Sequence, residues 1–189
     1  MYLFFDTETT GLPLKWKAPV SDLNNWPRLV QIAWLQYDGQ GKKISEQCHI
    51  IKPEGYSIPK DAADIHGITT QRAEREGVAL RTVLTAFSEL INQARFLVAH
   101  NMSFDEKIVG AEFLRTGVGS RLFQTGKICT MEAATDFCAL PGPYGYKWPK
   151  LSELHIKLFA RDFEEAHDAS VDGAACAKCF WELKKRGII

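Results

Sequence analysis

The hydrophobic pattern of this chain changes from strand-like runs near its start to helical stripes further on. Residues 2–6, 29–37 and 43–51 are rich in aromatic and β-branched side chains, and the turn sequence at 38–41 predicts a hairpin. The later predicted elements are a helix over 79–94, a strand over 95–99, and helices over 103–115, 150–159 and 171–185. This order predicts an α/β fold in which helices flank a mixed β-sheet.

The chain has the size of one domain. Its 189 residues, 46% of them hydrophobic, can bury one substantial core, and no repeat or low-complexity tract divides residues 1–189. Residues 12–28 contain three prolines and predict an irregular loop. No export signal or membrane-spanning stretch is visible, so we expect a cytoplasmic protein with reduced cysteines. Cys176 and Cys179 have no second metal-spaced pair, so we expect them to be buried helix residues.

The net charge distinguishes between modes of nucleic-acid binding. Lys plus Arg and Asp plus Glu both number 23, so the chain lacks the positive excess of proteins that coat long nucleic acids. An enzyme that holds a few terminal nucleotides needs no such excess, because divalent cations can turn an acidic cluster into a phosphate site. The zero net charge therefore argues against a long footprint, and not against a nucleic-acid substrate.

Two carboxylates close the first strand-like run. Asp6 and Glu8 are two residues apart in Asp-Thr-Glu-Thr-Thr-Gly, so both side chains leave one face of the strand. Neighbouring carboxylates repel each other unless a cation lies between them, and oxygen ligands suit Mg²⁺ or Mn²⁺. By itself, this motif is explained equally well as an acidic turn at the end of a strand.

A second acidic motif, His-Asn-Met-Ser-Phe-Asp over 100–105, follows the short strand. Ser103 and Glu106 predict a capping box that opens a helix, and Asp105 then falls in the first turn. The helix dipole stabilises a carboxylate there, so Asp105 also has a purely structural explanation. His100 and Asn101 can likewise be turn residues.

The third motif is His-Asp-Ala-Ser-Val-Asp over 167–172. Five residues turn a helix by about 500°, so His167 and Asp172 cannot share one helical face. They can converge if His167 lies on the preceding loop and Asp172 in the first turn, with Asp168 or Ser170 as the N-cap. The small residues 173–176 would let this helix lie close to a sheet. A lone exposed histidine beside a capping aspartate is the plainer alternative.

The three motifs, in this order, resemble those of the DEDDh exonuclease family, which includes the proofreading epsilon subunit of bacterial DNA polymerase III. Residues 28–33, 65–69, 127–130 and 150–154 are also similar to family segments, so the resemblance covers residues 3 to about 183. The loop over 12–28 is longer than in many members, and it lies close to where the substrate should enter. The resemblance implies a ribonuclease H-like fold and a metal-dependent 3′→5′ exonuclease.

The resemblance also implies roles for the acidic residues. Asp6, Glu8, Asp105 and Asp172 would hold two divalent cations, Mg²⁺ or Mn²⁺. By analogy, Asp6 would bridge the cations, Glu8 and Asp172 would complete one site, and Asp105 would hold the other cation through water. Two cations about 3.5–4 Å apart neutralise a phosphate and stabilise the leaving oxygen. His167 would deprotonate the attacking water, and the product would be a 5′-mononucleotide.

Further residues are expected to hold the 3′ end of the strand. The predicted substrate-binding residues are Thr9, Thr10, Gly11, Leu12, His66, Asn101 and Phe104. Leu12 would wedge against the last bases, as apolar residues at this place do in the family. Backbone groups of Thr9 and Thr10 would bracket the terminal nucleotide, and Gly11 would permit close approach. His66 is either a sugar or phosphate contact or a residue that stabilises a turn.

Residues 145–150 mix aromatic and basic side chains in a predicted loop. This composition suits stacking on a single strand, although a surface loop with a partly buried Trp148 explains it as well.

Single-stranded DNA is the favoured substrate, and an RNA-trimming exonuclease of the same family is the main alternative. A proofreading or non-catalytic subunit of a polymerase or replication complex is a third possibility. A non-catalytic subunit would be expected to lack an acid or the histidine, yet all five positions are occupied.

Overall fold

A mixed sheet of five strands forms the centre of the part of the chain that the computed structural model describes, residues 1–161, 163 and 167–189. The strands are β1 (Tyr2–Thr9), β2 (Leu29–Tyr37), β3 (Lys43–Ile50), β4 (Phe96–Ala99) and β5 (Gly126–Cys129). They lie in the order β3-β2-β1-β4-β5, with β1 antiparallel to β2 and parallel to β4. The predicted mixed sheet is confirmed, and β5 is a strand that the hydrophobic pattern did not predict.

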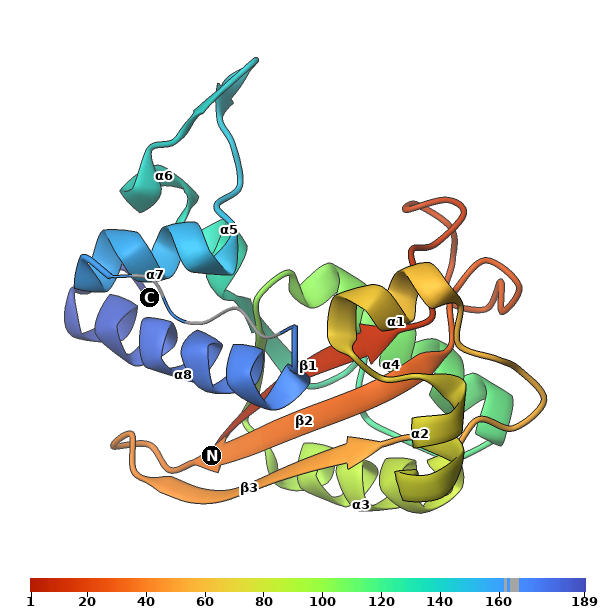
Figure 1. Ribbon diagram of the computed structural model, residues 1–189. Coiled ribbons are helices and arrows are strands. Elements are labelled where there is room, and N and C mark those ends of the chain that lie inside the picture. The colour runs from red at the N-terminus through yellow and green to blue at the C-terminus, as the bar shows by residue number, and fades with distance from the viewer. Residues whose placement is uncertain (162, 164–166) are drawn as a thin grey trace.

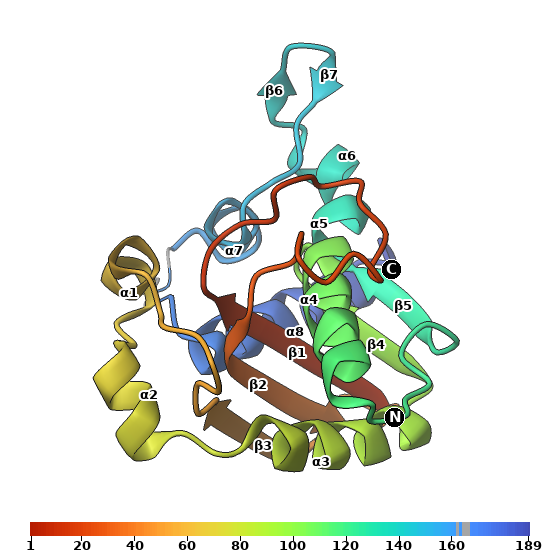
Figure 2. The same cartoon turned by 90° about the vertical axis from the view of Figure 1, so that its right-hand side faces the viewer.

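Helices cover both faces of the sheet (Figures 1 and 2). They are α1 (Lys60–His66), α2 (Thr70–Glu76), α3 (Leu80–Gln93), α4 (Met102–Thr116), α5 (Thr130–Ala133), α6 (Thr135–Cys138), α7 (Leu151–Phe159) and α8 (Ala169–Lys185). α3 and α4 lie on one face, and α8 lies on the other with α7 packed against it. Within the described residues, no helix combines the length and the apolar character needed to cross a membrane.

The alternation of side chains along β1 divides the core into two layers. Leu3 and Phe5 pack into the cluster shared with α3 and α4, whereas Phe4 packs against Phe180 of α8. Asp6 and Glu8 continue the series of Phe4, so they lie toward the α8 face. β1 extends to Thr9, three residues beyond its predicted end, so both carboxylates belong to the strand itself.

The predicted capping box of α4 is wrong. The helix begins at Met102, one residue before Ser103, and its N-cap is Asn101 in the left-handed conformation with φ 71°. Ser103 therefore lies inside the first turn, where it cannot serve as the N-cap. Glu106 pairs instead with Lys127 at 3.0 Å. Asp105 does lie in the first turn, as expected.

The helix α8 begins at Ala169, two residues before its predicted start. Asp168 is its N-cap and accepts a hydrogen bond from the Ser170 N–H at 2.9 Å. Asp172 falls in the first turn, and His167 lies on the loop that precedes the helix, as the third motif predicted.

Residues 10–28 form a long connection without helix or strand, which confirms the predicted loop. A buried ion pair fastens its C-terminal end to α4. The carboxylate of Glu112 accepts hydrogen bonds from Arg28 Nε at 2.8 Å and from the Leu29 N–H at 3.0 Å. Arg115 pairs with the same carboxylate and donates to the Trp26 carbonyl. Glu112 is fully buried, whereas Arg28 and Arg115 are partly exposed, so these hydrogen bonds satisfy the buried carboxylate and attach the loop to the helix.

Four short helices and one small hairpin in the described residues were not predicted. α1 and α2 have seven residues each and α5 and α6 four, too few for a hydrophobic stripe to stand out. The hairpin consists of β6 (Pro141–Gly142) and β7 (Gly145–Tyr146), and it projects as a narrow arm between α6 and α7 (Figure 1).

Candidate active site

Three carboxylates meet where α8 crosses the end of β1. Oxygen atoms of Asp6, Glu8 and Asp172 all lie within 4.8 Å of one another. Gly173 permits this approach, because a Cβ there would lie 3.0 Å from Leu35 Cδ1 and 4.0 Å from Asp6 Cβ. The helix therefore packs on the sheet at the turn that carries Asp172.

The fourth predicted carboxylate arrives from the opposite face. Asp105 of α4 is buried, and the hydroxyl of Thr7 donates a hydrogen bond to its Oδ1 at 2.7 Å. Thr7 lies between Asp6 and Glu8 on β1 but points to the α4 side. The end of β1 therefore has carboxylates on both of its faces, its own toward α8 and that of Asp105 on the α4 side.

Burial and mutual repulsion disfavour the ionised forms of these acids. Burial first, and then the charges of Asp105 and Asp172, raise the pKa of Asp6 well above its ordinary value. Burial first, and then the charge of Asp172, raise the pKa of Glu8 to about 8. Burial raises the pKa of Asp105 to about 7 despite its hydrogen bond from Thr7. A set of repelling oxygen donors without nitrogen or sulfur fits a hard divalent cation.

His167 lies at the rim of the same hollow. Its side chain is exposed, and its backbone has a positive φ of 40°. The hollow has a volume of about 360 Å³ and is lined by Asp6, His100, Lys150, Leu151, His167 and Asp172. The predicted convergence of His167 and Asp172 is therefore present in the structure.

A residue that the sequence patterns missed fastens the start of α8, next to His167 in the chain. Gln31 is buried on β2, and its Nε2 donates to Asp168 Oδ2 at 3.1 Å. Its Oε1 accepts from the Ala169 N–H at 2.9 Å. Gln31 thus ties the sheet to the N-terminus of α8, between His167 and Asp172. The sequence feature that could have revealed this role is a polar amide side chain in a mostly apolar strand.

His100 does not act as a simple turn residue, because both of its ring nitrogens contact other segments of the chain. Its Nδ1 lies 3.0 Å from Thr130 Oγ1, and its Nε2 lies 3.0 Å from the Pro149 carbonyl oxygen. Burial lowers the pKa of His100 to about 4, so the ring is neutral at neutral pH. Because a carbonyl only accepts, Nε2 carries the proton. This bond places Lys150, the next residue, on the wall of the hollow.

The turn after β1 is open on one side. Leu12 is 71% exposed, and Gly11 has a φ of 141° with no atom within 4 Å of where its Cβ would lie. The Thr10 N–H donates to the Arg28 carbonyl at 2.9 Å, so this one group is already engaged, and the bracketing of a nucleotide by backbone groups of Thr9 and Thr10 stays a prediction. Thr9 uses its hydroxyl to donate to the Gly11 carbonyl at 2.6 Å.

The three other predicted substrate residues surround this region. His66 is buried at the end of α1 and accepts the Ile68 N–H at Nδ1, 3.1 Å away, so its turn-stabilising role is present. Asn101 caps α4. Phe104 is half-buried, and its ring centre lies 5.8 Å from that of Trp16 in the long loop.

The cysteine pair of α8 is structural. Cys176 and Cys179 are buried, and all five cysteines, each within the described residues, are free thiols. The expectation of buried helix residues is confirmed.

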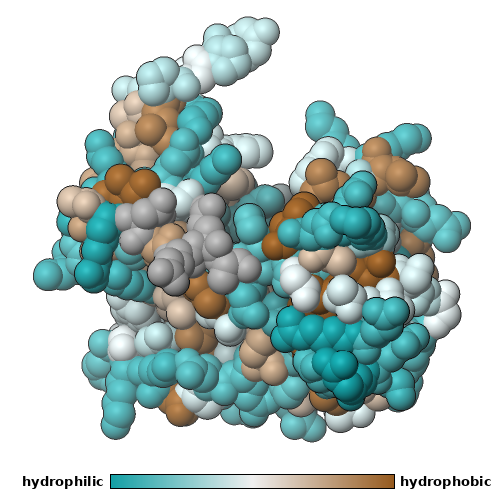
Figure 3. All heavy atoms as spheres, in the orientation of Figure 1, coloured by the Kyte–Doolittle hydropathy of each residue, from teal (hydrophilic) through white to brown (hydrophobic). Residues whose placement is uncertain are grey.

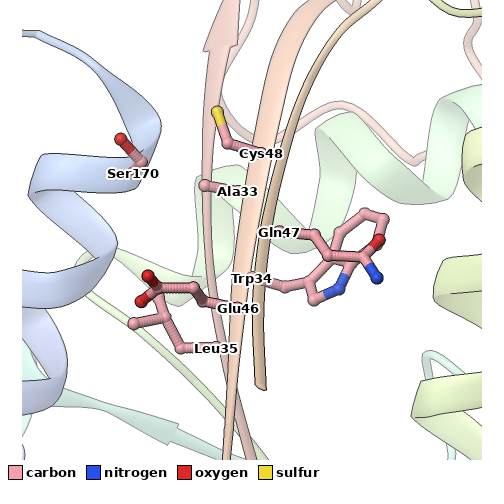
Figure 4. A pocket seen from close by; sticks show the side chains of 7 residues that line it. All are labelled: Ala33, Trp34, Leu35, Glu46, Gln47, Cys48 and Ser170. Atoms are coloured by element: carbon pink, nitrogen blue, oxygen red, sulfur yellow. The ribbon is translucent and has the colours of Figure 1, made fainter.

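A second hollow of about 240 Å³ lies between the sheet and the first turn of α8 (Figure 4). Leu35, Glu46 and Cys48 point toward Ser170, whereas Trp34 points away to the other face. Burial raises the pKa of the Cys48 thiol to about 11, so the thiol is not activated as a nucleophile. This hollow contains none of the four carboxylates.

Residues 3–180 match the sequence profile of a family described as RNase_T, exonuclease. The chain belongs to this exonuclease family. Its members are metal-dependent 3′→5′ exonucleases that act on nucleic acid. A search of curated protein sequences found no match.

Solved structures of exonucleases have the same fold as this family member. E. coli Exonuclease I in complex with a dA16 oligonucleotide has a TM-score of 0.76 and 21% identity, covering 98% of this chain and 41% of that chain. The zinc-bound complex of E. coli Exonuclease I with single-stranded DNA has a TM-score of 0.75 and 22% identity, with coverages of 98% and 40%. A moderately thermophilic Exonuclease I from Methylocaldum szegediense has a TM-score of 0.74 and 20% identity, with coverages of 98% and 40%. The chain spans about two fifths of the length of these proteins, and the ribonuclease H-like fold is confirmed.

Proposed function

We propose that this chain is a cytoplasmic exonuclease that removes 5′-mononucleotides from the 3′ end of single-stranded DNA. The observation that carries the proposal is the meeting of Asp6, Glu8 and Asp172 within 4.8 Å, with His167 lining the same hollow. The preference for single-stranded DNA draws support from the structurally similar E. coli Exonuclease I, which binds such oligonucleotides.

The four acids would hold two divalent cations, Mg²⁺ or Mn²⁺. When bound, the cations neutralise the scissile phosphate and stabilise the leaving oxygen. Asp6, Glu8 and Asp172 supply three oxygen donors, and Asp105, oriented by Thr7, supplies the fourth carboxylate. All of them must be ionised to bind, so a cation must displace the protons that burial retains.

His167 would act as the general base. Its exposed imidazole can accept a proton from the attacking water at the hollow and release it to solvent. Gln31 and Asp168 hold the start of α8, so the loop that carries His167 is fixed at that end.

The 3′-terminal nucleotide would lie against the turn after β1. The exposed Leu12 is available to wedge against a base, and the open side of Gly11 leaves room for the sugar. The predicted contacts of this nucleotide also include His66, Asn101, Phe104 and the backbone of Thr9.

The test is a cleavage assay on 5′-labelled single-stranded DNA and RNA with Mg²⁺, Mn²⁺ or EDTA. We expect a metal-dependent ladder that shortens from the 3′ end, and faster cleavage of DNA. Faster cleavage of RNA would replace the DNA assignment. No shortening of either by the folded protein would contradict the proposal and direct the search toward a polymerase or replication partner by co-purification.

A further inference from the structure

Residues 140–150, here called the arm, stand clear of the rest of the molecule (Figures 1 and 3). The paired strands β6 and β7 form its tip, and the Lys147 N–H donates to the Leu140 carbonyl at 2.9 Å below them. Three aromatic side chains on it face solvent: Tyr144 is fully exposed, Tyr146 57% and Trp148 63%. Trp148 lies on a surface hairpin and keeps more than half of its surface exposed, which agrees with the alternative of a surface loop. Exposed aromatic groups in one place mark an interaction surface.

The arm is continuous with the wall of the active-site hollow. His100 fastens its base through the Pro149 carbonyl, and Lys150 lines the hollow together with Asp6 and His167. Trp148 precedes Lys150 by two residues, so the arm leads away from the wall of the hollow toward its exposed tip. A strand that leaves the hollow on this side must pass the arm.

The charges on the arm indicate which class of molecule binds to it. Residues 140–150 contain two lysines and no acidic residue, and Lys147 and Lys150 alternate with Tyr146 and Trp148. Lys147 pairs with Glu153 of α7 at 2.5 Å, so Lys150 is the cation of the arm that faces the hollow. Aromatic faces interleaved with cations fit a flexible polyanion whose bases are exposed, because every base has a face that can stack. A duplex keeps those faces covered by its own stacking.

The long loop carries exposed apolar residues on the other side of the hollow. Leu12, Leu14 and Trp16 are all exposed, and the loop and the arm rise from opposite sides of the end of β1 (Figure 1). The space-filling view shows a notch between these two sides (Figure 3). The terminal nucleotide and the upstream strand therefore have separate surfaces available.

We propose that the arm is a second DNA-binding site, which stacks bases of the same strand several nucleotides 5′ of the terminal nucleotide. Tyr144, Tyr146 and Trp148 supply the stacking faces, and Lys150 attracts a phosphate where the arm meets the hollow. The identity of the occupant rests on the proposed function. The arm would keep a long strand bound after each terminal nucleotide leaves.

A binding assay in EDTA separates the arm from the metal-dependent chemistry. We would measure the Kd of a 12-nucleotide oligothymidylate for the wild type, for the double variant Tyr144→Ala/Trp148→Ala, and for Ile44→Ala. Ile44 is an exposed apolar residue at the opposite end of the sheet, so it is the matched control. Loss of two stacked bases should weaken binding about tenfold or more in the arm variant, and Ile44→Ala should bind like the wild type.

Turnover with a divalent cation gives the second measurement. For the arm variant we expect the KM of the 12-nucleotide strand to rise about tenfold relative to the KM of a trinucleotide, which is too short to reach from the active site to the arm. Equal changes for both lengths, or no change in Kd, would overturn the arm as a DNA site. If the wild type cleaves neither substrate, the proposed function fails, whereas the Kd values in EDTA still decide on the arm. Unchanged thermal unfolding of each variant shows that the fold is intact.

Discussion

At the scale of single residues, the acids and the histidine should respond differently to removal. Asp172→Ala should abolish cleavage, because it removes one of the three converging oxygen ligands. His167→Ala should slow cleavage by about 10²–10⁴-fold, the usual effect of losing a general base. Single-turnover cleavage of labelled DNA measures both. A loss below tenfold for His167→Ala would show that the histidine is a bystander.

Gln31 gives a prediction about positioning. Gln31→Leu leaves the Ala169 N–H without its partner and removes one hydrogen bond from Asp168. We expect a loss of about 1–3 kcal/mol in the free energy of unfolding and a lower kcat, since the start of α8 loses its attachment to the sheet. Urea unfolding and kcat measurements check this. Gln47→Leu, an exposed change on the neighbouring strand, is the control and should alter neither.

At the scale of elements, the contact between α8 and β1 depends on one missing side chain. Gly173→Val would place a Cβ 3.0 Å from Leu35 Cδ1, so the Leu35 side chain must shift or the helix must move away from the sheet that carries Asp6. We expect a cost of about 1–3 kcal/mol from overpacking and reduced metal binding. Thermal unfolding and Mn²⁺ titration measure the two effects.

Ala174→Val is the matched control for that contact, because Ala174 is the next residue of the same helix and is exposed. Its cost should stay near the difference in helix propensity, below about 1 kcal/mol. Equal losses for Gly173→Val and Ala174→Val would mean that close packing at Gly173 does not determine the position of α8.

At the scale of the whole molecule, the acidic cluster makes stability depend on pH and metal. The pKa of Glu8 is about 8 and that of Asp105 about 7 in the folded chain, against about 4 for such groups in an unfolded chain. Between about pH 4 and 8 the folded state therefore retains protons that the unfolded state has lost. The metal-free protein should lose stability as the pH rises through this window.

Thermal unfolding at several pH values, in EDTA and with Mg²⁺ or Mn²⁺, measures this dependence. A cation favours the ionised acids, so the stabilisation by metal should grow with rising pH. Asp172→Asn should flatten the pH dependence in EDTA, since its charge contributes to the raised pKa of Glu8 and of Asp6. A stability in EDTA that rises from pH 5 to 8 would contradict the raised pKa values.

Local patterns indicated the candidate site residues. The alternation of β1 sets Asp6 and Glu8 on one face, and the sequence 167–172 sets a loop histidine, a capping Asp168 and a first-turn Asp172. These features follow from strand and helix geometry over a few residues, so they could be predicted from the chain alone. The order of strands and helices likewise indicated the mixed sheet.

Contacts between distant parts of the chain were decided only by the tertiary structure. Gln31 bonds to Asp168 across 137 positions, Thr7 to Asp105 across 98, and His100 to Pro149 across 49. Each bond requires two elements to lie at one particular distance and angle, which no local pattern encodes. The same reason applies to the exposure of Trp148, because burial depends on what packs against a side chain. The sequence by itself supplied the candidate acids and the histidine, and the packing of α8 and α4 against β1 brought them to one place.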